Sequence, residues 1–280
     1  MKIKKTKTLL YILLVFCFLT QGVIVVNAKM PFYNLNPKEI VLRSQFYTTY
    51  SSSNEERKSN IYLASKSLNN TFVDVGGEFS FNKTVGERTI KRGYKVAKII
   101  FNGSFIEGVG GGVCQVSTTL YNAVLLAGLT ITEYHPHSLA VSYVAPSFDA
   151  MVNSGSADLR FVNNTDNPII IKTIANGERL TVQIYGEESQ YKYERLSITT
   201  EEIPAPKERV IIDEKGEYPD LLDGEQKTIT YSKKGLKSTA YIVKKKNGKT
   251  VEVIKLRKDK YNPITGLIVV GKEKDGVVTE

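Results

Sequence analysis

Apolar residues recur at helical spacing in two stretches of the chain. The first follows SNEE at 53–56, where an asparagine before acidic residues is typical of a helix start, and this helix is expected to end near Asn69-Asn70. Its apolar residues repeat every three or four positions: Ile61, Ala64 and Leu68. The second stretch ends at Gly128, a natural C-cap. Its apolar residues lie on one helical face: Val113, Val116, Leu120, Val124 and Ala127.

The pattern around these helices favours short strands and turns. Turns and short strands are expected at 75–82 and 85–103. Strand-like runs follow at 130–135, 139–144, 168–174 and 179–185. The N-terminal part, residues 29–187, is therefore predicted to be a mixed α+β domain.

The composition changes after Gly186. Residues 187–209 contain few large aliphatic side chains and include Pro204 and Pro206, which is typical of an extended segment between two units. Beyond this segment, β-forming residues alternate with lysines, and Asn247-Gly248 between two such runs is a strong hairpin signal. Residues 190–280 are predicted to form a small antiparallel all-β module that separates from residues 29–187, because few apolar residues are available for an interface.

Residues 1–28 have the organisation of a secretory signal. Four lysines precede an apolar run from Leu9 to Val26, and Val26-Asn27-Ala28 fits a cleavage site. An uncleaved anchor is the alternative, because the 19 residues from Thr8 to Val26 are nearly enough to span a bilayer. Both interpretations place the rest of the chain outside the cytoplasm, as a secreted or envelope-associated protein, and the second also ties it to the membrane.

Charge and cysteine content narrow the classes of partner. The chain of 280 residues has a formal charge of +9, which falls to +5 without the four lysines of residues 1–28. Outside the cell this balance fits an anionic wall polymer better than nucleic acid, although it equally serves solubility. Cys114 would be the only cysteine of the processed chain, so no internal disulfide is expected. No cofactor is expected either.

Cys114 lies where the second predicted helix begins, directly after a Gly-rich loop. Unpaired N–H groups and the positive end of the helix dipole favour a thiolate there and can hold a developing oxyanion. The helix and an extended return from Gly128 have similar lengths, about 20 and 23 Å, so His135 is expected beside Cys114. His137 would point to the same face if Pro136 does not break the extension.

These residues suggest a cysteine site that resembles papain-like and transglutaminase-like sites by geometry alone. The catalytic candidates are Cys114 as nucleophile, His135 as general base, His137, and Asp149 or Asp158 as the orienting acid. The substrate-binding candidates are Gly111, Gly112, Gln115, Tyr121 and Arg160. The expected reaction is acyl transfer or amide hydrolysis on wall peptide. Two other interpretations stay open: Cys114 as a small buried residue, or Cys114 and the two histidines as zinc ligands.

Several unusual sequence blocks, in order, resemble the VanW-type family, named after an accessory protein of a glycopeptide-resistance operon. The blocks are FSFNKTVGERTIKRGYKVAKII, GGGVCQVSTTLYNAVLLAGL, HPHSLAVSYV, FDAMV and DLRFVN, within residues 44–187. Around KKGLKSTAYIVKKKNGKTVEV and YNPITGLIVVG, the C-terminal part is similar to the G-five extracellular domain of wall enzymes and adhesins. The resemblance implies a Gram-positive envelope protein and does not supply a reaction.

Two hypotheses about function follow. In the first, the protein is a secreted enzyme that modifies peptidoglycan through Cys114, and the C-terminal module is its targeting domain. In the second, both domains bind peptidoglycan or an anionic wall polymer without catalysis, which the basic C-terminal module and the 16 tyrosines favour.

Overall fold

The computed structural model describes residues 40–101 and 103–272. The predicted signal or anchor at residues 1–28 lies outside these ranges. Within them, no helix combines the length and the apolar character that a membrane crossing requires.

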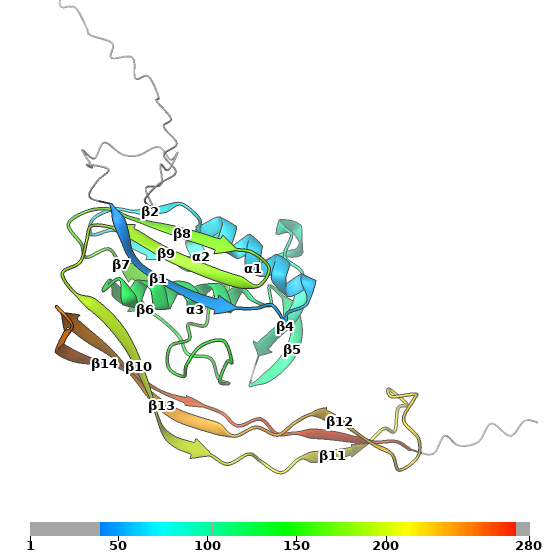
Figure 1. Cartoon of the computed structure of the whole chain (residues 1–280). Coiled ribbons are helices and arrows are strands. Elements are labelled where there is room, and N and C mark those ends of the chain that lie inside the picture. The colour runs from blue at the N-terminus through cyan, green and yellow to red at the C-terminus, as the bar shows by residue number, and fades with distance from the viewer. Residues whose placement is uncertain (1–39, 102, 273–280) are drawn as a thin grey trace, which may run out of the picture.

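A four-stranded antiparallel sheet, in the order β1-β9-β8-β2, lies against the two long helices (Figure 1). Its strands are β1 (Val41–Thr49), β2 (Thr71–Val73), β8 (Ile169–Ala175) and β9 (Arg179–Gly186). Helix α1 (Glu55–Leu68) packs on β8, and α3 (Val113–Leu126) packs on β1 and β9. The side chain of Asn54 caps α1, and Gly128 after α3 has a φ of 72°. Both predicted helices are therefore confirmed.

Smaller elements complete the N-terminal domain. A three-stranded sheet has the order β3-β7-β6, from β3 (Glu78–Ser80), β7 (Arg160–Val162) and β6 (Thr130–Glu133). Strands β4 (Val96–Phe101) and β5 (Ser104–Val109) form a ribbon that leads into α3. Two short helices, α2 (Phe81–Val85) and the 3₁₀ helix η2 (Ile90–Arg92), lie between β3 and β4. The strand expected at 139–144 is wrong, because residues 134–159 contain no strand.

The C-terminal part consists of two three-stranded sheets. The first has the antiparallel order β10-β13-β14, from β10 (Lys192–Ile203), β13 (Gly235–Lys246) and β14 (Lys249–Tyr261). The Asn247-Gly248 hairpin is confirmed, with φ of 52° and 76° between β13 and β14. The second sheet has the order β11-β15-β12, from β11 (Arg209–Ile212), β12 (Gln226–Thr230) and β15 (Leu267–Val270).

The expectation of purely antiparallel pairing in this module is wrong for one pair. Strands β11 and β15 pair in parallel. A hairpin forces antiparallel pairing, but these two strands are separated by β12 and by the long β13–β14 hairpin, so their connection permits the parallel arrangement.

The C-terminal sheet is not a separate unit from the N-terminal domain. Most of the expected extended segment is strand β10, and the β10-β13-β14 sheet crosses beneath α3 (Figure 1). Buried Ala240 and Ile242 belong to the same apolar core as α3, with Tyr193 and Leu256 packed against it. The expectation of an interface with few apolar residues is therefore wrong, because inward-facing residues of alternating strands supply one.

Candidate functional site

Residues 148–150 are not part of a sheet, and polar side chains of α3 hydrogen-bond to their backbone instead. Ser117 Oγ donates to the carbonyl of Ala150 at 2.6 Å, and the amide of Ala150 donates to Thr118 Oγ1 at 2.9 Å. Asn122 Nδ2 donates to the carbonyl of Phe148 at 2.8 Å. All these groups are buried. The helix therefore holds the backbone on both sides of Asp149.

The carboxylate of Asp149 binds His137 through one oxygen. The backbone amide and the Nδ1 atom of His137 each lie 2.7 Å from Asp149 Oδ2. Because Nδ1 is occupied, Nε2 is the nitrogen left for Cys114, whose thiol interacts with this imidazole as a hydrogen-bond partner. Cys114 Sγ also lies 3.4 Å from the carbonyl of Val152 and is only half-buried. The structure thus brings together Cys114, His137 and Asp149.

The three groups shift each other's proton affinities. Burial works against a charged thiolate, but the hydrogen bond and charge of His137 lower the pKa of Cys114 below its ordinary value. Burial also works against a charged imidazole, yet Asp149 and then Cys114 raise the pKa of His137 to about 9. Burial would raise the pKa of Asp149, but His137, followed by Arg257, lowers it to about 2. Together these shifts favour a thiolate–imidazolium pair.

The C-terminal module supplies the partners of the other Asp149 oxygen. Arg257 Nη2 lies 2.7 Å from Asp149 Oδ1, and Tyr261 Oη donates to the same atom at 2.5 Å. Tyr261 Oη also accepts the amide of Ser147 at 2.7 Å. Arg257 pairs with Asp259 at 2.7 Å and lies over the rings of Tyr121 and Tyr134.

Sequence reasoning did not place Arg257 and Tyr261 in the site, although a signal is present. Residues 257, 259 and 261 of β14 are buried, whereas the lysines between them, at 258 and 260, are exposed. Alternation with period two marks the inward face of a strand. A polar inward face made of Arg257, Asp259 and Tyr261 indicates buried polar partners.

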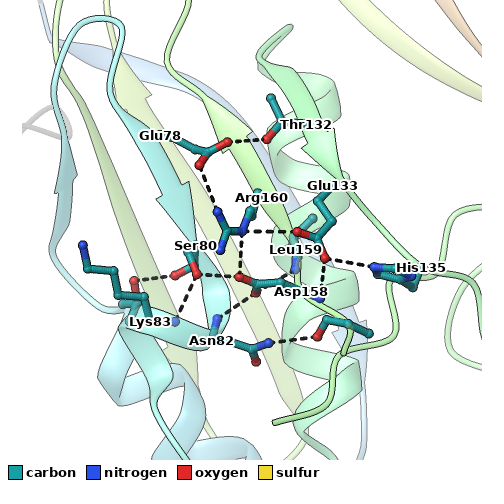
Figure 2. A network of polar contacts seen from close by, with 12 residues as sticks. Glu78, Ser80, Asn82, Lys83, Thr132, Glu133, His135, Asp158, Leu159 and Arg160 are labelled. Carbon is teal, nitrogen blue, oxygen red and sulfur yellow. Dashed lines mark hydrogen bonds and ion pairs between the residues drawn. The ribbon is translucent and has the colours of Figure 1, made fainter. Parts of the chain in front are cut away.

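His135 and Asp158 lie in a different network from Cys114 (Figure 2). His135 Nε2 lies 3.0 Å from Glu133 Oε1. Asp158 accepts from Ser80 Oγ at 2.5 Å and from the amide of Asn82 at 2.8 Å, next to α2. The expectation that His135 faces Cys114 is wrong, because β6 ends at Glu133 and the chain leaves the extended path before it reaches the histidines.

The two histidines therefore do not share a face, and Asp158 does not orient His137. His137 is 4% exposed, whereas the His135 side chain is 36% exposed. In the described ranges no group of three or more His, Cys, Asp or Glu side chains has a metal-binding arrangement, so Cys114 and the two histidines do not converge as zinc ligands.

Most of the expected substrate-binding residues have packing roles. Gly111 and Gly112 are buried, and a Cβ atom on Gly111 would lie 2.7 Å from the backbone of Ala97. Gln115 is buried and donates to Thr48 Oγ1 and the carbonyl of Thr49. Tyr121 is 1% exposed within the core. Arg160 is the one member of this set with a substantially exposed side chain, at 43%.

Comparison with known proteins identifies the N-terminal domain. Residues 56–185 match the family model described as VanW like protein. These residues form a VanW-like domain. The chain is similar to the uncharacterized protein YoaR of Bacillus subtilis, 44% identical over 144 residues, which are 51% of this chain and 48% of that protein. It is also similar to the vancomycin B-type resistance protein VanW of Enterococcus faecalis, 29% identical over 139 residues, which are 48% of this chain and 50% of that protein.

The chain spans about half the length of these curated relatives. Similar solved structures include the G5 domain of IgA1 protease, at 19% identity and a TM-score of 0.20, covering 30% of this chain and 92% of that domain. The HP0197-G5 structure is also 19% identical, with a TM-score of 0.16, covering 30% of this chain and all of that domain. Both of these structures are G5 domains.

An open pocket of about 430 Å³ lies in the VanW-like domain beside the His135 network. Its wall includes α2, the loop before η2, the 154–158 segment and Arg160. Tyr143, which is half-buried, lies near Cys114 and Asp149, and its pKa is raised by burial and then by the charges of these two residues. Sequence reasoning missed Tyr143 because no regular element predicts its direction.

Proposed function

We propose that the VanW-like domain catalyses acyl transfer or amide hydrolysis with Cys114 as nucleophile, His137 as general base and Asp149 as orienting acid. The observation that carries this proposal is the 2.7 Å contact between His137 Nδ1 and Asp149 Oδ2, on the side of the ring away from Cys114. A base held in one tautomer by a buried carboxylate is the arrangement that activates a neighbouring nucleophile.

Each step of this reaction has a group in place. The Cys114 thiolate attacks the carbonyl carbon of an amide, and a C–S bond forms. The amide of Cys114 itself would donate to the oxyanion, because the amides of Val113 and Gln115 already donate to the carbonyls of Gly110 and Gly112. The C–N bond then breaks, and the imidazolium of His137 gives its proton to the leaving amine. His137 next accepts a proton from water or from a second amine, which attacks the thioester and releases Cys114.

Wall peptide outside the cytoplasm is the proposed substrate. Three observations support it: the signal-like residues 1–28, the positive charge of the chain and the similarity to a vancomycin resistance protein. The C-terminal sheet would then contact an anionic wall polymer through exposed lysines of β14.

Alkylation of the native protein tests the nucleophile. At about pH 6 a thiol of ordinary pKa is almost wholly protonated, so rapid reaction of Cys114 with iodoacetamide indicates a stabilised thiolate. We expect His137→Ala to slow the labelling strongly and the matched variant His135→Ala to leave it near wild type. Equal rates in both variants, or no labelling of the native protein, would refute the assignment.

Wall binding without catalysis is the second candidate function, and the exposed lysines of β14 favour it. Lys255, Lys258 and Lys260 form one charged row. If this role is correct, the protein sediments with purified wall at low salt, and replacing the three lysines by Gln releases it whether or not Cys114 is intact. Failure to sediment would exclude it.

A further inference from the structure

Arg88 differs from the other arginine of the open pocket in its pairing. Arg160 contacts three carboxylates, those of Glu78, Glu133 and Asp158, each at 3.2 Å. Arg88 is half-buried, and its Nη1 atom donates only to neutral acceptors, Asn82 Oδ1 at 2.8 Å and the carbonyl of Gly86 at 3.0 Å. Within the part of the chain that the structure describes, Arg88 has no ion pair.

Arg88 connects the pocket wall with the loop that precedes α3. Its side chain lines the pocket, and its Cβ would lie 3.0 Å from a Cβ atom placed on Gly110, just before α3. The opposite wall, residues 154–158, continues from Val152, whose carbonyl lies 3.4 Å from Cys114 Sγ. Arg88 therefore belongs to the pocket wall and is also close enough to Cys114 for the two charges to interact.

We propose that Arg88 binds a carboxylate of the acyl substrate and so selects substrates with an anionic group close to the carbonyl that Cys114 attacks. This inference rests on the proposed function and adds a substrate class to it. A partly buried cation without a carboxylate partner is incompletely compensated, and a guanidinium presents a fork of donors that matches a carboxylate.

The charges of the pocket favour a singly charged ligand. Its wall carries three basic side chains, Lys83, Arg88 and Arg160. It also carries three acidic side chains, Glu87, Glu133 and Asp158. A dianion such as phosphate would be repelled by these acids, whereas one carboxylate balances the one arginine of the pocket wall that lacks an ion pair. Burial lowers the pKa of Arg88, and the negative charge of Cys114 is the first of the groups that oppose this shift.

A pair of alkylating agents tests this proposal without knowledge of the natural substrate. Iodoacetate carries a carboxylate, and iodoacetamide is its neutral analogue of similar shape. The ratio of their rates with Cys114 cancels any change in the nucleophilicity of the thiolate and reports the local charge. One positive charge several Å away should favour iodoacetate about fivefold, so Arg88→Gln should lower the ratio by about that factor.

Two further variants control this experiment. Arg92→Gln removes a charge four residues away that does not line the pocket, and we expect its ratio to equal that of wild type. Arg88→Lys keeps the charge and should retain most of the preference for iodoacetate. An unchanged ratio in Arg88→Gln would overturn the proposal while leaving the Cys114 mechanism intact.

An equilibrium measurement separates this inference from the proposed function. If Cys114 is not alkylated in the native protein, the proposed function fails, but the pocket can still be titrated with N-acetylglycine and its neutral analogue N-acetylglycinamide. We expect only the carboxylate to shift the NMR signals of pocket residues such as Gly86 and Gly155, and Arg88→Gln to abolish the shifts. Equal responses to both compounds, or no response to either, would overturn the inference.

Discussion

Replacing Tyr261 by Phe removes one buried oxygen that links the C-terminal module to the VanW-like domain. The ring is 1% exposed, so the substitution leaves its packing intact. The lost hydroxyl donates to Asp149 Oδ1 at 2.5 Å and accepts the amide of Ser147 at 2.7 Å. Ser147 is fully buried, so water cannot replace the lost partner without rearrangement.

The expected magnitude follows from these two contacts. A hydrogen bond to a charged group contributes about 1.5–3 kcal/mol, and a buried amide left unpaired costs about 1–3 kcal/mol. The two effects overlap because Arg257 and His137 still bind the carboxylate, so we expect Tyr261→Phe to lower the free energy of unfolding by about 3 kcal/mol. In a protein of this size that corresponds to a fall in Tm of about 8 °C.

Thermal and urea unfolding followed by circular dichroism measure this change. The matched control is Tyr231→Phe, since Tyr231 is 74% exposed and its substitution should change the free energy of unfolding by less than about 0.5 kcal/mol. A single transition that moves as a whole in Tyr261→Phe would show that the two parts unfold together. A Tm equal to that of wild type would refute the account of Asp149 as a carboxylate held across the interface.

Three further predictions concern stability and exposure. His137→Gln should lower the free energy of unfolding at about pH 6, and this loss should shrink towards about pH 10. The pKa of His137 is about 9 in the folded protein and lower in the unfolded chain, so protonation of His137 stabilises the fold fully below the unfolded pKa and no longer does so above about pH 9; urea unfolding at both pH values checks this. Gly111→Ala should cost about 1–3 kcal/mol, because its Cβ would meet the backbone of Ala97, whereas Gly155→Ala, with open space around it, should leave urea unfolding unchanged. Limited proteolysis followed by mass spectrometry should find the first cuts at 213–225, which is mostly exposed and irregular, and not within β10, which pairs with β13 along its length; early cuts in β10 would contradict the pairing.

The sequence correctly predicted those helix ends and turns that depend on interactions between residues close together in the chain. The asparagine cap of α1, the glycine after α3 and the Asn247-Gly248 turn each act within a few residues, and each lies where the sequence predicted. The 139–144 segment fails for the opposite reason. Its alternation resembles a strand, but no neighbouring strand is available, and the segment just after it is held by side chains of α3.

In the candidate site, too, the sequence did not predict the contacts that depend on residues far apart in the chain. Its composition, Cys114 with a histidine and an aspartate, was predicted from residue types and order, whereas the choice between His135 and His137 depended on a strand that ends at Glu133. The contact between Arg257 and Asp149 joins residues that are 108 positions apart. No local pattern in the sequence specifies such a partner, although the alternation along β14 marks Arg257 as inward-facing.

Two parts of the chain act on Asp149 in different ways: helix α3 positions its backbone, and the C-terminal sheet contacts its carboxylate. Helix α3 holds the backbone around it through neutral hydrogen bonds, which fix its position but do not balance a buried negative charge. Arg257 and Tyr261 supply that balance through Oδ1 and leave Oδ2 to His137. Without them the buried carboxylate would keep its contact with His137 but would lose the charge of Arg257 and the hydrogen bond from Tyr261, so its charged form would be less stable. Contact between the two domains therefore adds to the stability of the ionised Asp149 that His137 already favours.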